Sequence, residues 1–236
     1  GSWGIYDNPF MQFFVNHLAE EKEPFFSTVF TISSHEPYII PEKYKNIFSE
    51  GDISMHKCVR YTDYALKRFF DEAKKESWFN NTIFVMVADH ANLIYYSEYR
   101  KELNLNTVPI LFYHPDGRFS GVNNSLAQQI DIYPTILDMI GYDKTFRSWG
   151  RSLTSDKENP FVIKYSGFYY FFYDNHVCCF DGEKVIGFYE LSDASMKNNL
   201  INEKRDLMYF IEKKCKDVIQ DYMNRIIDLN LAENRF

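Results

Sequence analysis

The sequence predicts an α/β protein: a mostly parallel sheet with flanking helices, then a small antiparallel β meander and a C-terminal helix. Continuous apolar runs of strand length favour strands that are covered on both faces, as in a parallel sheet. A helical pattern between two of these runs favours a βαβ unit. After residue 160 the runs become short, aromatic and separated by turn residues, which is typical of a meander. We therefore expect two domains, residues 1–153 and residues 154–236.

The first section alternates strand and helix patterns. Phe25–Ser33 reads as a buried strand, and from Ser54 to about Lys75 apolar residues recur at helical spacing. Thr82–Ala88 is apolar without alternation, so strand, helix and strand follow in order and predict a parallel pair. A third strand is expected at Val108–Tyr113, and a helix from about Gln128 to Ile140.

The second section predicts four short strands and a closing helix. The strands are expected at Phe161–Tyr165, Phe168–Tyr173, His176–Phe180 and Lys184–Leu191. The helix is expected from Glu203 to about Leu229. Its predicted inner side consists of Leu207, Phe210, Ile211, Val218, Tyr222 and Ile226.

Composition limits the function. The 236 residues are 45% hydrophobic and include 22 Phe and 18 Tyr, enough for a packed core. The net charge of -7 argues against a nucleic-acid partner or an anionic membrane surface, because no basic stretch could neutralise a row of phosphates. An acidic protein that binds a phosphate or sulfate ester would be expected to use a metal ion.

Targeting and cysteine signals are weak. No apolar run approaches the roughly 20 residues that span a bilayer. The opening Gly1-Ser2 without Met is typical of a cloning remnant, so a missing signal or anchor says little about the natural protein. The four cysteines lack zinc-finger spacing, and the redox compartment stays open.

Candidate ligands follow the predicted strands. The first strand leads into Ser33-Ser34-His35, the second ends in Asp89-His90, and the third in His114-Pro115-Asp116. In an open parallel sheet, ligands bind outside the carboxyl ends of the strands. Three histidines and two carboxylates would then lie along one edge. Carboxylate and imidazole together suit Zn²⁺ or Mn²⁺.

Each candidate also has a structural reading. Asp89 could cap a turn and His90 could be an ordinary strand-end histidine, since neighbours on an extended strand face opposite ways unless the chain bends. His114 lies in a turn-like His-Pro-Asp-Gly sequence and is interpreted as structural. The other histidines, read as structural or solvated, are His17, His56 and His176.

Other catalytic motifs are missing from the sequence. There is no GxGxxG or Walker-type phosphate loop, no GxSxG elbow, and no Cys/Ser-x-Pro-x-Arg sulfatase motif. The residues therefore supply half of a site and no nucleophile.

Several segments resemble, in order, those of lipoteichoic acid synthase-like proteins in the alkaline phosphatase and sulfatase superfamily. They are Phe25-Phe26-Ser27-Thr28, Ser33-Ser34-His35-Glu36-Pro37-Tyr38, Tyr61-Thr62-Asp63, Asn81-Thr82-Ile83, Ala88-Asp89-His90, Val108–Tyr113, Asp131-Ile132-Tyr133-Pro134-Thr135-Ile136-Leu137, Gly150-Arg151-Ser152-Leu153, Phe188-Tyr189-Glu190-Leu191 and Asn198-Asn199-Leu200. Singly these motifs are weak; together they cover nearly the whole chain.

The resemblance implies roles for three residues. Asp89 and His90 would complete a metal site, and His35 would contact the substrate phosphate or, in two-metal relatives, a second ion. The nucleophilic Thr or Ser of the family would lie before residue 1. Ala91 departs from the common Asp-His-Gly pattern, and the chain lacks a further downstream His of the kind that zinc-rich phosphoethanolamine transferases use, which favours a single metal ion. That ion would be Mn²⁺ or Zn²⁺, with Mg²⁺ or Ca²⁺ as alternatives.

The resemblance makes residues 1–153 the carboxy-terminal part of an alkaline phosphatase-like catalytic domain. The first hypothesis is a transferase of a phosphoglycerol-type group, anchored upstream and facing outward from a bacterial cell membrane. The second is a hydrolase of sulfate or phosphate esters, with water as the acceptor. For either enzyme the substrate would be a phosphate or sulfate ester, with a lipid head group or a glycan as candidates. The third is a non-catalytic extracytoplasmic binding domain.

Overall fold

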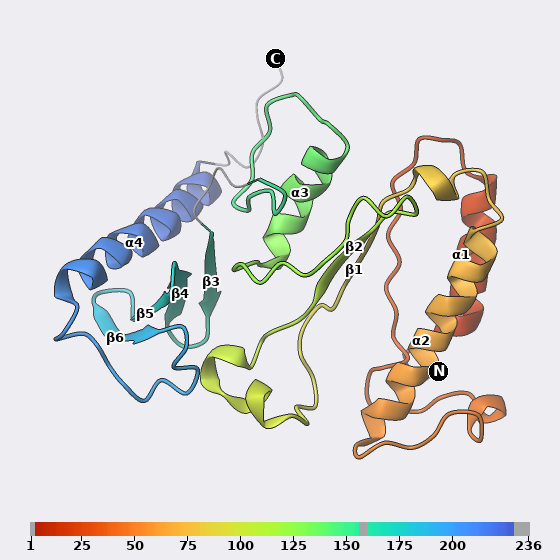
Figure 1. The fold of residues 1–236 in the computed structure, drawn as a ribbon, viewed down its shortest axis with the longest axis horizontal. Helices are drawn as coiled ribbons and strands as arrows, with labels where there is room; N and C mark the ends of the chain where they lie inside the picture. The colour runs from red at the N-terminus through yellow and green to blue at the C-terminus, as the bar shows by residue number, and fades with distance from the viewer. Residues whose placement is uncertain (1–2, 156–159, 229–236) are drawn as a thin grey trace. The chain divides into compact units, whose positions relative to one another are not determined.

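The computed structural model describes residues 3–155 and 160–228, and it divides into two compact units (Figure 1). The first unit comprises Gly1–Tyr95 and Pro109–Gly121; the second comprises Tyr96–Val108 and Val122–Phe236. The predicted boundary at residue 153 falls inside the second unit, which also contains the helix after residue 130. Within the described residues, no helix is both long and apolar enough to cross a bilayer.

Two packed helices form the core of the first unit. Helix α1 (Asp7–Glu20) and helix α2 (Ser54–Ala73) lie side by side, and α2 confirms the helix predicted from Ser54. Their buried cluster consists of Met11, Val15, Leu18, Ala65, Phe69, Ala73, Trp78 and Phe79. Helix α1 is not among the elements predicted above, although Met11, Val15 and Leu18 have helical spacing.

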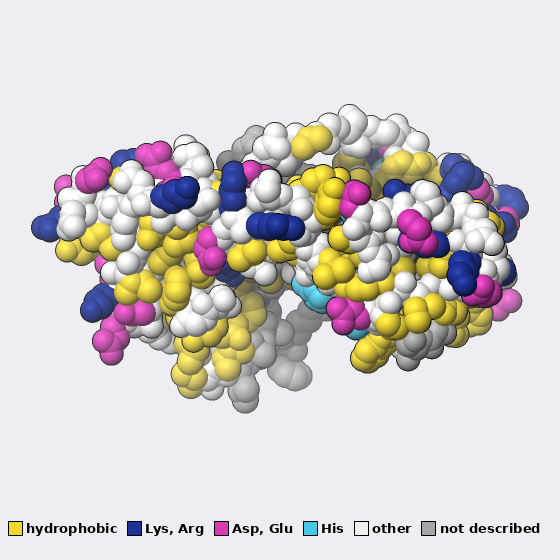
Figure 2. Space-filling model, turned by 90° about the horizontal axis from the view of Figure 1, so that it is seen from below, with side chains coloured by type: hydrophobic (Ala, Val, Ile, Leu, Met, Phe, Trp, Pro, Cys, Tyr) yellow, Lys and Arg dark blue, Asp and Glu magenta, His cyan; other side chains and the backbone are white. Residues whose placement is uncertain are grey.

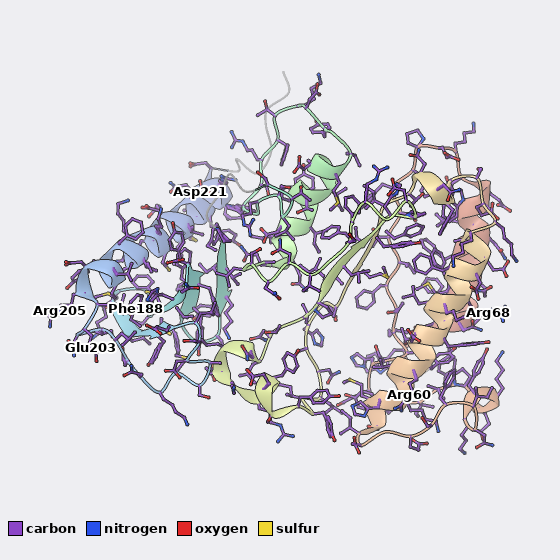
Figure 3. All side chains as sticks on the ribbon, in the orientation of Figure 1. Arg60, Arg68, Phe188, Glu203, Arg205 and Asp221 are labelled. Atoms are coloured by element: carbon purple, nitrogen blue, oxygen red, sulfur yellow. The ribbon has the colours of Figure 1, made fainter. Side chains whose placement is uncertain are left out.

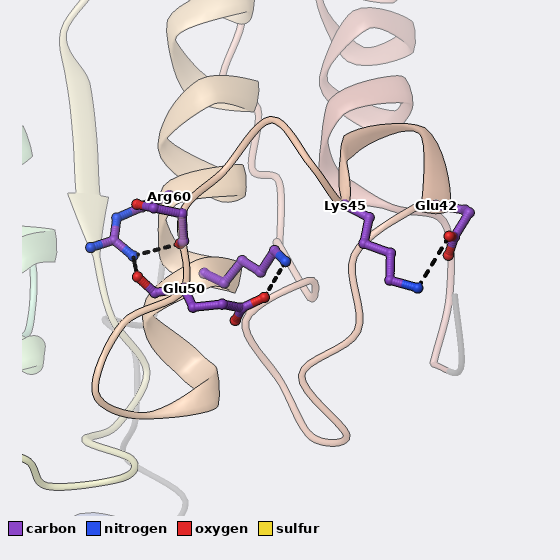
Figure 4. A network of polar contacts seen from close by, with 6 residues as sticks. Glu42, Lys45, Glu50 and Arg60 are labelled. Atoms are coloured by element: carbon purple, nitrogen blue, oxygen red, sulfur yellow. Dashed lines mark hydrogen bonds and ion pairs between the residues drawn. The ribbon is translucent and has the colours of Figure 1, made fainter.

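The polar loop that precedes α2 is fastened to that helix. It contains the short 3-10 helix η1 (Glu42–Tyr44). Lys45, which follows η1, forms an ion pair of 3.2 Å with Glu42 at its start (Figure 4). On α2, Arg60 donates to the backbone oxygens of Ser49 and Glu50 at 2.8 and 3.1 Å. These bonds satisfy carbonyl groups of an irregular segment, so the loop is held against the first turns of α2.

The strands of the first unit pair antiparallel. Strand β1 (Phe84–Val87) and strand β2 (Ile110–Tyr113) lie where strands were expected, with Phe84 opposite Tyr113 and Val87 opposite Ile110. The α/β class is confirmed, but the expected parallel direction is corrected for the described strands. A parallel pair needs a crossover, usually an α-helix. The chain between β1 and β2 contains only the 3-10 helices η3 (Ser97–Arg100) and η4 (Glu102–Asn104).

The predicted buried strand at Phe25–Ser33 is not observed. The segment has no strand pairing, and Phe26 and Phe30 are 84% and 67% exposed. Phe25 and Val29 instead pack against the core of α1 and α2. The prediction is wrong because it assumed cover on both faces, whereas in the described chain only one side of the segment is covered.

The second unit contains the predicted meander. Strands β3 (Phe161–Tyr165), β4 (Tyr169–Tyr173), β5 (His176–Phe180) and β6 (Val185–Glu190) follow one another in a four-stranded antiparallel sheet. Their bounds agree closely with the four predicted runs. The agreement confirms the antiparallel meander, since the turn residues fix both the number of strands and the register.

Helix α4 (Arg205–Ile227) covers one face of this sheet. Figure 3 shows Phe188, which is fully buried, between the meander and the helix. The predicted helix is confirmed, and its inner side is confirmed in part: Ile211 is buried, and Leu207 and Val218 pack against the core. Met208 and Cys215, which were not predicted, are buried as well. The exposed members of the predicted stripe are Phe210 (51%), Tyr222 (48%) and Ile226 (40%). Spacings of three and four residues put 208, 211 and 215 on one face, and position 210 falls outside it. The predicted end at Leu229 lies outside the described residues.

A short helix is joined to the segment that follows it through the side chains of Asp131 and Thr135. Helix η5 (Gln129–Asp131) leads into α3 (Ile132–Met139), close to the predicted helix. The buried Asp131 carboxylate accepts the Gln128 and Arg151 N–H groups at 2.9 and 3.0 Å. Thr135 accepts the N–H of Leu153 at 2.9 Å. These two side chains therefore join α3 to the segment that follows it, which is a structural role.

Candidate functional site

His35 lies in a tight loop, residues 33–38, at the end of the segment that follows α1. The His35 N–H donates to Ile32 O, and the Tyr38 N–H donates to His35 O, each at 3.0 Å. Tyr38 has a φ of 59°, in the left-handed region, which closes the turn. His35 is exposed, and its Nδ1 lies 3.0 Å from Glu36 O. A neutral imidazole that donates from Nδ1 keeps a lone pair on Nε2.

Asp89 and His90 lie on the loop that follows β1, residues 88–93. The chain bends there, and Asp89 Oδ1 accepts the His90 N–H at 2.9 Å. The His90 ring turns back, so that Nε2 is 3.4 Å from Asp89 Oδ2. The bend removes the objection that neighbouring side chains face opposite ways. Both side chains are more than half exposed, at 54% and 63%.

The spacing of this pair fits two ligands of one metal ion. His90 Nδ1 lies 2.8 Å from Ala91 O, so a neutral ring that donates there leaves the Nε2 lone pair beside the carboxylate. Ligand bonds of about 2.0–2.1 Å in a tetrahedral site put two donor atoms about 3.3 Å apart. Among the residues that the structure describes, no group of three or more His, Cys, Asp or Glu could hold a metal. Within that part of the chain, Asp89 and His90 are a pair of neighbouring donor side chains.

The two loops are in contact. Tyr38 Oη donates to Asn92 Oδ1 at 3.1 Å, joining residues 33–38 to residues 88–93. Burial and the Glu36 carboxylate raise the pKa of Tyr38, so the hydroxyl keeps its proton and remains a donor. At the other end of the segment, Phe25 packs on Trp78, with ring centroids 5.7 Å apart.

The contacts of Phe25 and Tyr38 show that the segment between them runs in the same direction as β1. Trp78 also packs on Phe84, the first residue of β1, at a centroid distance of 6.4 Å. The segment therefore begins beside the start of β1 and ends beside the loop that follows it. His35 and the Asp89–His90 pair thus belong to loops at the same end of the unit. On the face drawn in Figure 2, acidic, basic and hydrophobic side chains are interspersed, and histidine also reaches the surface.

His114 lies at the opposite end of the strand pair, and this corrects the expectation that three histidines share one edge. It follows Tyr113, which pairs with the start of β1, so three residues of strand, about 10 Å, separate the two ends. His114 is 5% exposed, and its Nδ1 is 2.8 Å from Asp116 Oδ1. The Arg118 guanidinium holds the pKa of Asp116 well below its ordinary value. The surroundings of His114 are those of a structural turn.

The remaining histidines lie elsewhere in the chain. His17 on α1 forms an exposed pair with Glu21 at 3.3 Å, and His56 packs edge-on against Tyr95. His176, in the second unit, stacks on Phe188 with 5.2 Å between ring centroids. Their contacts account for their positions without a ligand, which agrees with the structural or solvated reading.

One residue beside the candidate site, Asp7, is not singled out by any motif in the sequence. Asp7, the first residue of α1, is completely buried and contacts the residues before His35. A lone Asp ahead of apolar residues at helical spacing signals the start of a helix. No sequence pattern points to its long-range partners.

Comparison with solved structures identifies the superfamily. An alkaline phosphatase superfamily protein from Vibrio parahaemolyticus matches 95% of this chain and 56% of its own, with a TM-score of 0.72 and 27% identity. Ps i-CgsB in complex with a neocarrahexaose matches 89% of this chain and 53% of its own, with a TM-score of 0.66 and 15% identity, which shows a shared fold. The fold is that of the alkaline phosphatase superfamily.

Sequence comparison then gives the family. The sulfatase family model matches residues 1–142, so the chain belongs to the sulfatase family. It is 28% identical to the lipoteichoic acid synthase of Staphylococcus aureus over 176 residues, which are 67% of this chain and 27% of that protein. The chain thus spans about a quarter of the length of the curated relatives it matches.

Proposed function

We propose that this chain is part of an extracytoplasmic, metal-dependent transferase that moves a phosphoglycerol-type group. The observation that carries the proposal is the Asp89–His90 pair, whose Oδ2 and Nε2 atoms are 3.4 Å apart on an exposed loop. The similarity to lipoteichoic acid synthase supports the substrate class. An anionic lipid head group on the outer face of a bacterial membrane is the substrate we expect.

The reaction proceeds in two displacements. A threonine hydroxyl, expected outside these 236 residues, attacks phosphorus, and the P–O bond to the lipid breaks as the threonine loses its proton. The departing lipid alkoxide takes up a proton. An acceptor hydroxyl then attacks the phospho-threonine, releasing the threonine and completing the transfer.

Residues of this chain have three roles in the proposal. Asp89 and His90 hold a divalent cation, Mn²⁺ or Zn²⁺, which when bound neutralises charge on the phosphate oxygens. His35, on the neighbouring loop, contacts the substrate, and an imidazole N–H of this residue donates to a phosphate oxygen or to the leaving oxygen. The Tyr38–Asn92 hydrogen bond keeps the two loops together.

Metal binding can be measured on the chain itself by titration calorimetry with MnCl₂ or ZnCl₂. We expect Asp89→Ala and His90→Ala each to weaken binding at least about tenfold, because each removes one of two neighbouring donors. His17→Ala is the matched control, since His17 faces Glu21 at 3.3 Å with similar exposure. If His17→Ala lowers the affinity as much as His90→Ala, the site assignment is wrong.

Turnover requires the natural full-length protein, tested with phosphatidylglycerol and with an aryl sulfate in the presence of Mn²⁺ or Zn²⁺. We expect transfer from the lipid, abolished by Asp89→Ala and reduced about a hundredfold by His35→Ala. Hydrolysis of the aryl sulfate instead would support an ester hydrolase, the alternative that the sulfatase family match favours. No turnover of either substrate would contradict both and favour a binding domain.

A further inference from the structure

Asp7 joins three parts of the first unit through its buried carboxylate. Oδ1 accepts the N–H groups of Ile32 and Ser33 at 2.9 and 3.0 Å, and Oδ2 accepts the Thr62 hydroxyl of α2 at 2.6 Å. The Asp7 N–H donates to Ser33 Oγ at 2.9 Å, so Asp7 and Ser33 are paired in both directions. Asp7 is 0% exposed, and three donors directed at it offset the cost of burying a carboxylate.

These bonds lie immediately before the loop that carries His35. The His35 N–H donates to Ile32 O, so the residue held by Asp7 also closes the turn under the histidine. Residues just ahead of Asp7 contact the same loop: the Trp3 indole N–H donates to Glu36 O, and its ring lies 4.8 Å from the His35 ring. Asp7 therefore holds the start of the His35 loop at Ser33, and Trp3 contacts the loop at His35 and Glu36.

The contacts define what a substitution would remove. Alanine at position 7 leaves the Ile32 and Ser33 N–H groups without their acceptor, and leaves the Thr62 hydroxyl without a partner. Asparagine keeps one oxygen for the two N–H groups, and its amide can donate to Thr62 Oγ, because a hydroxyl both donates and accepts. The arrangement therefore needs an acceptor at Oδ1 more than it needs a negative charge.

We propose that Asp7 is a positioning residue for His35: by fixing the backbone of Ile32 and Ser33 against α2, it sets where the imidazole is presented. The role of His35 in turnover rests on the function proposed above. The positioning itself concerns only the geometry of the chain and can be measured without substrate.

The test is NMR on the 236-residue chain, comparing Asp7→Ala and Asp7→Asn with the wild-type chain. In Asp7→Ala we expect the Ile32 and Ser33 amides to exchange at least about tenfold faster relative to amides in α2, since a hydrogen bond to a charged group is lost. We also expect the His35 ring signals to move and their pH titration to change. Asp7→Asn should restore the exchange rates and the His35 titration toward wild type.

Asp131→Ala is the matched control, because Asp131 is an equally buried carboxylate that accepts two backbone N–H groups in the second unit. It should leave the His35 signals and the Ile32 and Ser33 exchange unchanged. Thr62→Ala, which removes one donor only, should shift the same signals as Asp7→Ala by less, and it decides the question if Asp7→Ala does not fold. Unchanged His35 titration and unchanged Ile32 and Ser33 exchange in a folded Asp7 or Thr62 variant would overturn the proposal.

In the natural full-length protein, Asp7→Ala should lower kcat more than it raises KM, and Asp7→Asn should recover most of the loss. If wild-type protein turns over none of the substrates, the proposed function fails while the NMR result still decides the positioning role. If turnover is normal in Asp7→Ala, the positioning role fails while the proposed function stands.

Discussion

The core of the second unit and the candidate site of the first unit are built in different ways. The second unit is a regular four-stranded meander whose core, including Phe171, Cys178 and Phe188, is almost fully buried. In the first unit the candidate residues His35, Asp89 and His90 lie on irregular, exposed loops. Those loops are held by individual hydrogen bonds, such as Tyr38 to Asn92 and the Asp7 carboxylate to Ser33.

The difference shows how this fold separates stability from chemistry. Apolar burial in the meander is non-directional, so the stabilisation of the fold is distributed over many contacts. A loop that presents ligands to solvent has little apolar surface to bury, so its conformation depends on a few directed bonds. Substitutions in the second unit should therefore change the free energy of unfolding, whereas substitutions around Asp7 and Tyr38 should change the geometry of the candidate site.

The largest effect is expected for Phe188→Ala. Phe188 is fully buried between the meander and α4, so its truncation should lower the free energy of unfolding by about 4 kcal/mol, measured by urea denaturation. Phe210→Ala on α4 is the control, since Phe210 is 51% exposed, and it should cost less than about 1 kcal/mol. Similar losses for the two variants would show that the buried face of α4 has been assigned incorrectly.

A smaller effect is expected in the segment before His35. Phe25→Ala should cost about 2 kcal/mol, because Phe25 packs against Trp78 and the core of α1 and α2. Phe26→Ala should change the free energy of unfolding by less than about 0.5 kcal/mol, since that ring is 84% exposed. The reverse order in urea denaturation would restore the buried-strand prediction for Phe25–Ser33.

The smallest effect is a pH dependence at His176. Burial, and then the charge of Lys204, lower the pKa of His176 below its ordinary value. The unfolded chain then binds a proton more readily than the folded chain, so stability is full above about pH 6.5 and declines as the pH falls toward the folded pKa. His176→Phe should remove this part of the pH dependence. Urea denaturation at pH values from about 7.5 to about 5, on either side of the ordinary histidine pKa of about 6.5, measures it.

That result should be compared with His17→Phe, in which the exposed His17 of α1 is replaced. We expect His17→Phe to retain the wild-type decline on acidification. An identical pH profile for the wild-type chain and His176→Phe would mean that the folded protein does not disfavour protonation of His176.

The sequence predicts the second unit better than the first for a physical reason. Turn residues at 166–167, 174–175 and 181–182 determine where β4, β5 and β6 begin. Local signals of this kind can be recognised in a single sequence. The direction of β2 relative to β1 depends on the connection between them, which a short apolar run does not reveal. The exposure of Phe26 likewise depends on which neighbours the segment has.

The candidate site could be predicted in part. Residue types and strand ends pointed to Asp89, His90 and His35, and Asp89 and His90 do approach each other because the chain bends. The position of His114 at the other end of the strand pair was missed because it follows from the antiparallel register. The long-range partners of Asp7 could not be predicted, since its contacts with Ser33 and Thr62 span 26 and 55 residues.

The central claim is that the loops carrying His35 and the Asp89–His90 pair lie at one metal-binding end of the first unit. Its most direct test is to add Mn²⁺ to the chain and follow the histidine ring signals by NMR, because a paramagnetic ion broadens signals according to their distance from it. We predict that His90 broadens first, His35 next and His114 less, and that Asp89→Ala abolishes this order. Broadening of His114 before His35, or the same order in Asp89→Ala, would contradict it.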